Sequence, residues 1–307
     1  MKKAFLSLLL LIAPTFAATP FERGLLAFNE GGYRAAVQQF NKEIQARPRN
    51  AQAYLARADA YYQLANYQYA AADYAKAIEL NSKLGAKAYL SRAKAYIGLK
   101  NYNSAILDLN VAANISQNEQ IYYVRGSAYY AIGNYKAALS DYNRGISLEH
   151  NPVKAYGERG KVYFNMGDYR KAIEDFSYLV SLDPQNGSAY NGRGAAYAKS
   201  GDYAKAISDY TSAIRYSPRE IDAYLNRAEA YEKTGDEKKM ITDYGQAIAI
   251  DGGNPLIYAK RGSAYYDIGK EKEAMSDAQN ACRLGDCALL NRLNADAEKN
   301  KKTFWFF

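Results

Sequence analysis

The sequence predicts an all-α solenoid of about eight stacked helical hairpins. Three observations support it: a recurring dipeptide, a heavy use of tyrosine, and the spacing of apolar residues within each repeat. The chain has 307 residues, of which 31 are Tyr, whereas Trp and His occur once each. Usage this uneven indicates a position that recurs. Gly and Pro occur in ordinary amounts, so collagen-like and disordered classes are excluded.

Residues 1–17 are expected to be a secretory signal peptide and no part of the fold. Met1-Lys2-Lys3 is cationic, and Ala4 to Ala13 is an apolar run too short to cross a membrane. Thr15-Phe16-Ala17 then offers small residues before a cleavage site. No Cys follows the run, so a lipid-anchored N-terminus is excluded. The segment resembles bacterial export signals, and we expect a periplasmic protein. The alternatives are secretion and an uncleaved N-terminal anchor.

The charge and hydropathy of the remaining chain argue against nucleic-acid binding and against membrane spans. The formal net charge is +8, and cleavage would remove Lys2 and Lys3. This excess is mild for a chain this long and well short of a nucleic-acid footprint. No later stretch approaches the roughly 18 continuous apolar residues of a membrane span, so we expect a soluble mature protein.

The repeat is defined by an Arg followed by Gly or Ala, which recurs every 33 to 35 residues. Its copies are Arg23, Arg57, Arg92, Arg125, Arg159, Arg193, Arg227 and Arg261. With this Arg as position 7, the repeats span 17–50, 51–84, 86–118, 119–152, 153–186, 187–220, 221–254 and 255–288. Gly85 is an extra residue between the second and third repeats.

Each repeat is expected to form a helical hairpin. Apolar or aromatic residues at positions 4, 8 and 11 share one helical face, as do those at 17, 20, 24 and 27. Tyr recurs at 4, 11, 17 and 24, which explains the composition. Gly near position 15 ends the first helix, and Pro48, Pro184 and Pro218 follow the second. A single hairpin cannot bury its aromatic face, whereas a stack of eight can.

These residues resemble the tetratricopeptide repeat. One example is the set Tyr190, Arg193-Gly194, Tyr197, Gly201-Asp202-Tyr203, Ala206, Tyr210, Ala213 and Pro218. The resemblance covers nearly all of the chain after residue 17, and eight correlated copies make it far more specific than one motif. It implies a right-handed α-solenoid with a C-terminal capping helix and a role in binding other proteins. The capping helix is expected from Leu289 onward, within 289–307.

A second charged residue recurs together with the arginines. Asp occupies position 23 in seven repeats, and Gln39 occupies it in the first. We expect a ladder of ion pairs between helices, which fixes register more than it adds stability. The alternative is a charged ligand track, but ligand sites rarely repeat so uniformly. The expected members are Arg57, Arg92, Arg125, Arg159, Arg193, Arg227 and Arg261 with Asp73, Asp108, Asp141, Asp175, Asp209, Asp243 and Asp277.

No group of residues points to catalysis, a metal or a cofactor. His150 is the single histidine and has no nucleophile at a useful spacing. Carboxylates belong to the ladder or to solvated faces, and no glycine-rich phosphate loop is present. Cys282 and Cys287, far from that histidine, do not make a zinc site. In an oxidising compartment they are expected to form a disulfide; the alternative is two small buried side chains. We expect no enzyme.

The resemblance implies that positions 2, 5, 9, 12 and 13 of the first helices line an inner surface. The expected groove residues are Phe28, Tyr62, Tyr123, Tyr130, Phe164, Lys87, Lys94, Lys154, Lys161 and Lys199. We expect Tyr62, Tyr130 and Phe164 to be partly exposed and untouched by their own hairpin. Such a surface fits an extended peptide with apolar and acidic residues. Alternatively, the rings pack between repeats. The carboxylate clamp of chaperone-binding relatives needs Lys at 5 and Asn at 9, and no repeat has both.

The predicted function is that of a periplasmic adaptor that binds other envelope proteins. A scaffold that binds peptidoglycan or another glycan is the alternative, because aromatic grooves also stack on sugars. The tail Lys299 to Phe307 is basic and then aromatic. It is expected to fold back or fray, to contact a membrane interface, or to meet a partner. The oligomeric state is not predicted.

Overall fold

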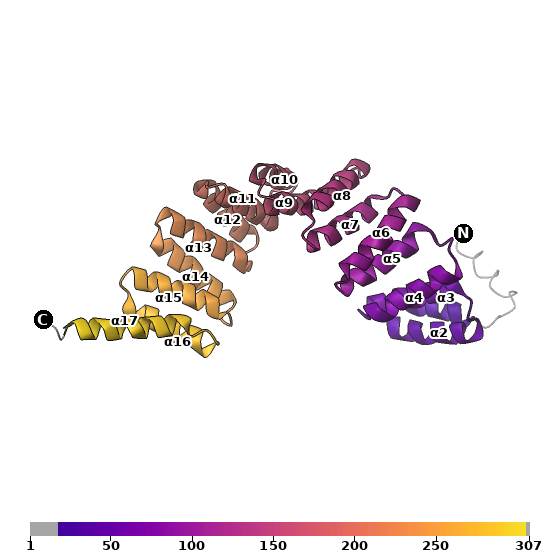
Figure 1. Cartoon of the computed structure of the whole chain (residues 1–307), viewed down its shortest axis with the longest axis horizontal. Helices are drawn as coiled ribbons and strands as arrows, with labels where there is room; N and C mark the ends of the chain where they lie inside the picture. The colour runs from indigo at the N-terminus through magenta and orange to yellow at the C-terminus, as the bar shows by residue number, and fades with distance from the viewer. Residues whose placement is uncertain (1–17, 305–307) are drawn as a thin grey trace, which may run out of the picture. The chain divides into compact units, whose positions relative to one another are not determined.

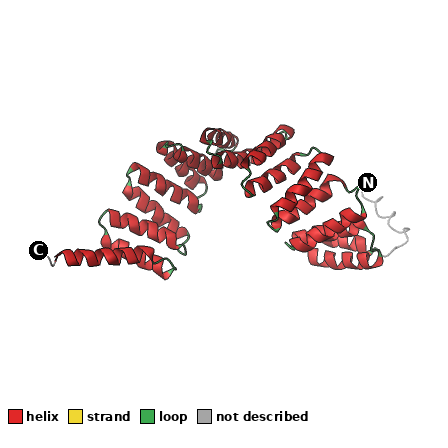
Figure 2. Ribbon diagram, viewed as in Figure 1, coloured by secondary structure: helices red, strands yellow, loops and turns green. Residues whose placement is uncertain are grey.

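The computed structural model describes residues 18–304, and every regular element in that range is an α-helix (Figure 1, Figure 2). The predicted signal peptide at 1–17 lies outside the described residues, as do residues 305–307 and all side chains after residue 298. The first eight helices are α1 (Pro20–Asn29), α2 (Tyr33–Ala46), α3 (Ala51–Gln63), α4 (Tyr67–Leu80), α5 (Gly85–Gly98), α6 (Tyr102–Ile115), α7 (Glu119–Ala131) and α8 (Tyr135–Leu148). The others are α9 (Val153–Asn165), α10 (Tyr169–Leu182), α11 (Gly187–Lys199), α12 (Tyr203–Tyr216), α13 (Ile221–Thr234), α14 (Glu237–Ile250), α15 (Pro255–Asp267), α16 (Glu271–Arg283) and α17 (Ala288–Phe304).

Consecutive helices pack as hairpins, α1 on α2 and so on to α15 on α16, and α17 packs on α16. The predicted all-α solenoid of helical hairpins is confirmed. The chain divides into two compact parts after His150. We call α1–α8 the N-terminal half and α9–α17 the C-terminal half. Within each half, the second helix of a hairpin also contacts the first helix of the next, as α2 contacts α3 and α10 contacts α11.

The turn inside each hairpin requires a left-handed backbone at position 15. Six repeats place Gly there, with φ between 74° and 89°. Ala65 and Lys100 take the same position with φ of 57° and 58°. A side chain in this conformation brings its Cβ close to the backbone, which costs free energy that glycine avoids. The next residue then caps the second helix, as Asp202 does by accepting the backbone N–H of Lys205 at 3.1 Å.

Replacing Ala65 or Lys100 with Gly is therefore expected to raise the free energy of unfolding by up to about 1 kcal/mol each, because the relief of strain exceeds the added freedom of the unfolded chain. Urea unfolding of the two variants measures the effect. Ala75→Gly, inside α4, is the control and should lower stability by about 1 kcal/mol. If all three variants are destabilised equally, the turn is not strained at Ala65 and Lys100.

The core of each hairpin combines small residues with one large ring. Phe176 shows the arrangement in the C-terminal half, where it is 5% exposed. A Cβ added to Gly160 of the same hairpin would lie 3.1 Å from this ring, and one added to Gly192 of the next hairpin would lie 2.8 Å from it. The two glycines therefore allow one ring to fill the space between two hairpins.

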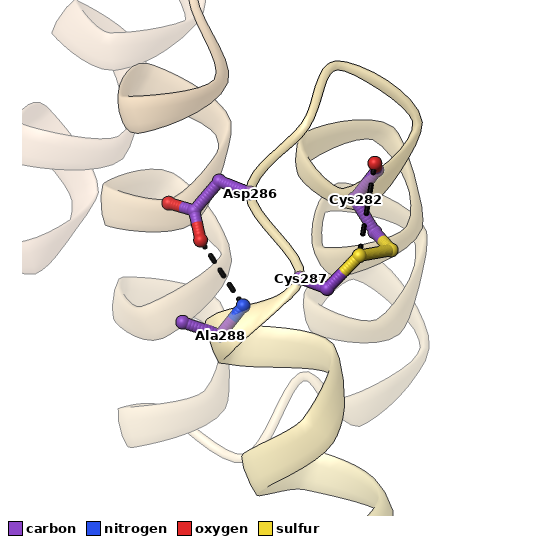
Figure 3. Close-up of a disulfide and its surroundings, with 4 residues drawn as sticks. All are labelled: Cys282, Asp286, Cys287 and Ala288. Atoms are coloured by element: carbon purple, nitrogen blue, oxygen red, sulfur yellow. Dashed lines mark hydrogen bonds between the residues drawn. A yellow bond between two sulfur atoms is a disulfide. The ribbon is translucent and has the colours of Figure 1, made fainter.

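The helix α17 covers the last hairpin. Leu289 and Leu293 are buried against Ala274 and Ala278 of α16. A disulfide joins Cys282, near the end of α16, to Cys287, just before α17 (Figure 3). The carboxylate of Asp286 accepts the backbone N–H of Ala288 at 3.0 Å, at the start of α17. The bridge thus ties the terminal helix to the hairpin that it covers.

Candidate functional site

Seven of the eight arginines at position 7 pair with the aspartate at position 23 of the same hairpin, and the first, Arg23, donates instead to the side-chain oxygen of Gln39 at 3.3 Å. In every couple Nε and Nη2 donate to the two carboxylate oxygens at 2.6–2.9 Å. The couples are Arg57–Asp73, Arg92–Asp108, Arg125–Asp141, Arg159–Asp175, Arg193–Asp209, Arg227–Asp243 and Arg261–Asp277. Such two-bond pairs hold the two helices of a hairpin in register.

The same guanidinium groups also connect neighbouring hairpins. In the N-terminal half, Nη1 of Arg57 donates to Asn41 at 2.6 Å. In the C-terminal half, Nη1 of Arg193 donates to Ser177 at 3.2 Å, and its guanidinium lies 5.4 Å from the ring centre of Tyr190. The hydrogen bonds to Asp209 raise the pKa of Arg193. Since its three nitrogens are all engaged within the protein, Arg193 is a structural residue.

The aromatic residues at position 12 are half-buried, and four of the five contact a tyrosine of their own hairpin. The paired ring centres lie 5.2–5.7 Å apart in Phe28–Tyr33, Tyr62–Tyr67, Tyr130–Tyr135 and Phe164–Tyr169. The expectation that no residue of the hairpin contacts Tyr62, Tyr130 or Phe164 is therefore wrong. Positions 12 and 17 flank the short turn, so the first ring of the second helix meets the last ring of the first. The recurrence of Tyr at position 17 could have predicted this contact from the sequence.

Tyr123 also packs within its hairpin and does not stand open in a groove. Its hydroxyl donates to Glu149 at 2.7 Å, and its ring occupies the space beside Gly145, where a side chain would clash. Four of the predicted lysines are exposed: Lys87, Lys154, Lys161 and Lys199. Lys161 forms an ion pair with Glu158 at 2.8 Å. Lys94 is half-buried, and this burial lowers its pKa.

A pocket of about 540 Å³ lies in the N-terminal half, between the first helices of three consecutive repeats. It is lined by Phe21 and Leu25 of α1, by Gln52, Leu55, Ala56 and Asp59 of α3, and by Leu84, Lys87, Ala88 and Ser91 at and beside the start of α5. Most of these stand at positions 2, 5, 6 and 9. The extra Gly85, with φ of 73°, begins α5 and brings Leu84 into the lining.

Two pockets of the C-terminal half are more highly charged. One of about 390 Å³ is lined by Phe164, Ala195, Ala198, Lys199, Tyr203, Tyr210, Asn226, Glu229, Ala230 and Lys233. The other, about 380 Å³, includes Glu232, Lys260 and Asp267. Among the predicted groove residues, only Lys87, Phe164 and Lys199 line these three pockets. Leu25, Leu55 and Asp59 are not among the predicted groove residues, although positions 5 and 9 belong to the inner surface that the resemblance implies.

Tetratricopeptide repeat models match this sequence over most of the chain. One matches residues 21–83, 158–218 and 196–255, which is more than half of the chain, and others match residues 86–119 and 126–167. The chain belongs to the tetratricopeptide repeat family. No curated protein matches it. Together with the ladder and the hairpins, the family assignment identifies the array as a protein-interaction fold.

Solved tetratricopeptide structures share the fold. The C-terminal part of a TPR repeat-containing protein from Cytophaga hutchinsonii is 23% identical, with a TM-score of 0.64 over 77% of this chain and 97% of that one. A tetratricopeptide repeat protein from Parabacteroides merdae is 19% identical, with a TM-score of 0.62 over 83% of this chain and 97% of that one. YrrB, described as a TPR protein with an unusual peptide-binding site, is 26% identical, with a TM-score of 0.53 over 60% of this chain and 95% of its own.

In the described part of the chain, His, Cys, Asp and Glu side chains form no group of three that could hold a metal ion. None of the described helices combines the length and the apolar character needed to cross a membrane.

Proposed function

We propose that this tetratricopeptide chain is a non-catalytic scaffold that binds extended segments of other proteins along its first helices. One observation carries the proposal: the pocket of the N-terminal half is built by residues at equivalent positions of three successive repeats. Successive side chains of an extended peptide can enter successive pockets of such a row. The peptide-binding site named for YrrB supports the same use of the fold.

The lining of this pocket favours side-chain burial by a partner. Leu25 is 39% exposed, and the partly buried Phe21 and Leu55 provide further apolar surface beside it. Covering such surface is favourable, and a few anchored side chains dominate the energy of most interfaces. The glycan-binding alternative has less support, because four of the five rings at position 12 that would stack on a sugar already contact a tyrosine of their hairpin.

The location that fits this function best is the periplasm. The proposal rests on the export pattern of residues 1–17. A disulfide at the C-terminal hairpin supports it, because disulfides persist in oxidising compartments. Binding partners would then be other proteins of the envelope.

Binding to a random library of acetylated and amidated nine-residue peptides tests the proposed function. The wild-type protein is expected to bind a subset of these peptides, and Leu25→Lys should weaken that binding at least about tenfold, since a charge would be buried under the peptide. Leu107→Lys is the matched control, because Leu107 on α6 is 68% exposed and lines none of the three pockets. Circular dichroism melting checks that both variants fold. Equal losses in the two variants, or no binding by the wild type, would contradict the proposal.

A further inference from the structure

The lining of the pocket in the N-terminal half includes a single carboxylate beside its apolar side chains. Asp59, at position 9 of α3, lies half-buried among Leu25, Leu55 and Ala56. Position 9 holds Leu25 in the repeat before and Lys94 in the repeat after. The carboxylate is therefore a local feature of this pocket and not part of the repeated ladder.

Tyr74 holds this carboxylate in place. Its hydroxyl donates to Oδ1 of Asp59, and the ring is 2% exposed in the core between α3, α4 and α5. Oδ2 of Asp59 accepts no hydrogen bond from the residues that the structure describes. No buried side-chain oxygen or nitrogen in the described residues lacks a partner, so Oδ2 is at least partly accessible to solvent. One oxygen is fixed by the protein, and the other is free to accept a donor from a ligand.

The environment of Asp59 favours a cationic donor. Burial raises its pKa, which means that the carboxylate is poorly solvated and would gain from a positive partner. Lys87, on the exposed side of the pocket, acts on Asp59 from a distance and forms no ion pair with it in the structure. A flexible, exposed lysine of this kind holds a carboxylate weakly, because solvent screens the attraction.

A basic side chain matches both parts of the pocket. Lysine and arginine carry a long aliphatic stem and a charged end, and the stem covers apolar surface while the end seeks a partner. Phe21, Leu25 and Leu55 offer the apolar surface, and Oδ2 of Asp59 offers the partner. A wholly apolar side chain would cover Asp59 without replacing its water, and an acidic one would be repelled by it.

We propose that the pocket of the N-terminal half binds an arginine or lysine side chain of the bound peptide, with Asp59 as its counter-charge. This inference rests on the proposed peptide-binding function and adds a specificity to it. It also replaces, for this half, the expectation of an acidic ligand that the exposed lysines suggested. Asp59 is thus the residue that distinguishes one peptide from another at this pocket.

The test uses four pools of acetylated and amidated nine-residue peptides that differ at one fixed central residue: arginine, its neutral analogue citrulline, norleucine or glutamate. Affinity is measured by fluorescence polarisation. The wild type should bind the arginine pool about tenfold more tightly than the citrulline pool, as expected for one hydrogen-bonded charge pair. This advantage should shrink as salt is added. Lys87→Ser should enlarge it about two- to threefold, because a competing cation is removed.

Asp59→Asn is the decisive variant, because the amide oxygen can still accept the hydroxyl of Tyr74 while the charge is lost. It should reduce the arginine advantage to less than about threefold. Glu79→Gln is the matched control: the same charge is removed from an exposed site on α4, and the advantage should persist. An unchanged advantage in Asp59→Asn overturns the inference. Equal binding of all four pools by the wild type overturns the inference but leaves peptide binding intact. Absence of binding by every pool contradicts the proposed function itself.

Discussion

Arg193→Ala is expected to lower the free energy of unfolding by about 3–5 kcal/mol, which is the cost of leaving a buried charge without its partner. The carboxylate of Asp209 would lose two hydrogen bonds of 2.8 Å while remaining buried, with 6% of the residue exposed. The link from Arg193 to Ser177 of the preceding hairpin would be lost as well. Urea unfolding of the full-length variant measures the size of the loss of stability. Hydrogen exchange then shows whether the loss is located in the C-terminal half.

Two control variants test whether the loss of stability comes from an unpaired buried charge. Arg170→Ala should change stability by less than about 0.5 kcal/mol, because its contact with Glu174 is 3.7 Å long and exposed on both sides. Replacing Arg193 and Asp209 together with Leu should cost much less than Arg193→Ala, since no buried charge is left over. Burial raises the pKa of Asp175 despite its pairing with Arg159, which is consistent with a desolvation cost that the pair only partly offsets. If Arg193→Ala resembles Arg170→Ala, the ladder does not organise the fold.

Phe176→Ala is expected to lower the free energy of unfolding by about 3–5 kcal/mol through the cavity that it leaves. The ring lies between Gly160 and Gly192, whose backbones cannot move together without disturbing two hairpins. The cavity should therefore collapse only partly, which places the loss near the upper end of the range. Thermal and urea unfolding of the variant provide the measurement.

Phe164→Ala is the control for the same chemical change at the candidate groove. Phe164 is half-buried and contacts Tyr169 at the rim of its hairpin, so the expected loss is about 1 kcal/mol. This loss is small but not zero, because the ring does have a partner. If Phe164→Ala costs as much as Phe176→Ala, Phe164 belongs to the core and not to a binding surface.

The fold could be predicted from the sequence because a fixed period forces the same hairpin to recur. Eight copies of the Arg and up to seven copies of each recurring Tyr define the two helical faces, and no long-range information is needed to see them. The turns at Ala65 and Lys100 were not predictable in the same way, since neither residue signals a left-handed backbone. The division after His150 was also hidden, because the repeat continues across it without a change of pattern.

The candidate site was harder to predict than the fold. The contact between Phe164 and Tyr169 depends on the geometry of the turn, which the helical period does not specify. Asp59 resembles any other charged residue of an exposed helix face until Tyr74 and the leucines around it are placed. The roles of residues that recur in every repeat could be predicted from the sequence. The role of Asp59 depends on the residues packed around it in one repeat and could not be predicted.

Photo-crosslinking with the tightest-binding peptide tests directly whether peptides bind along the first helices of the repeats. The peptide carries a benzoylphenylalanine beside its central residue, and mass spectrometry identifies the residues of the protein that it labels. We expect labelling of α1, α3 and α5 around Leu25 and Leu55. This labelling should be lost when unlabelled peptide competes. Labelling concentrated on second helices, for example around Leu107 of α6, would show that the peptide binds another face. It would contradict the proposed binding along the first helices.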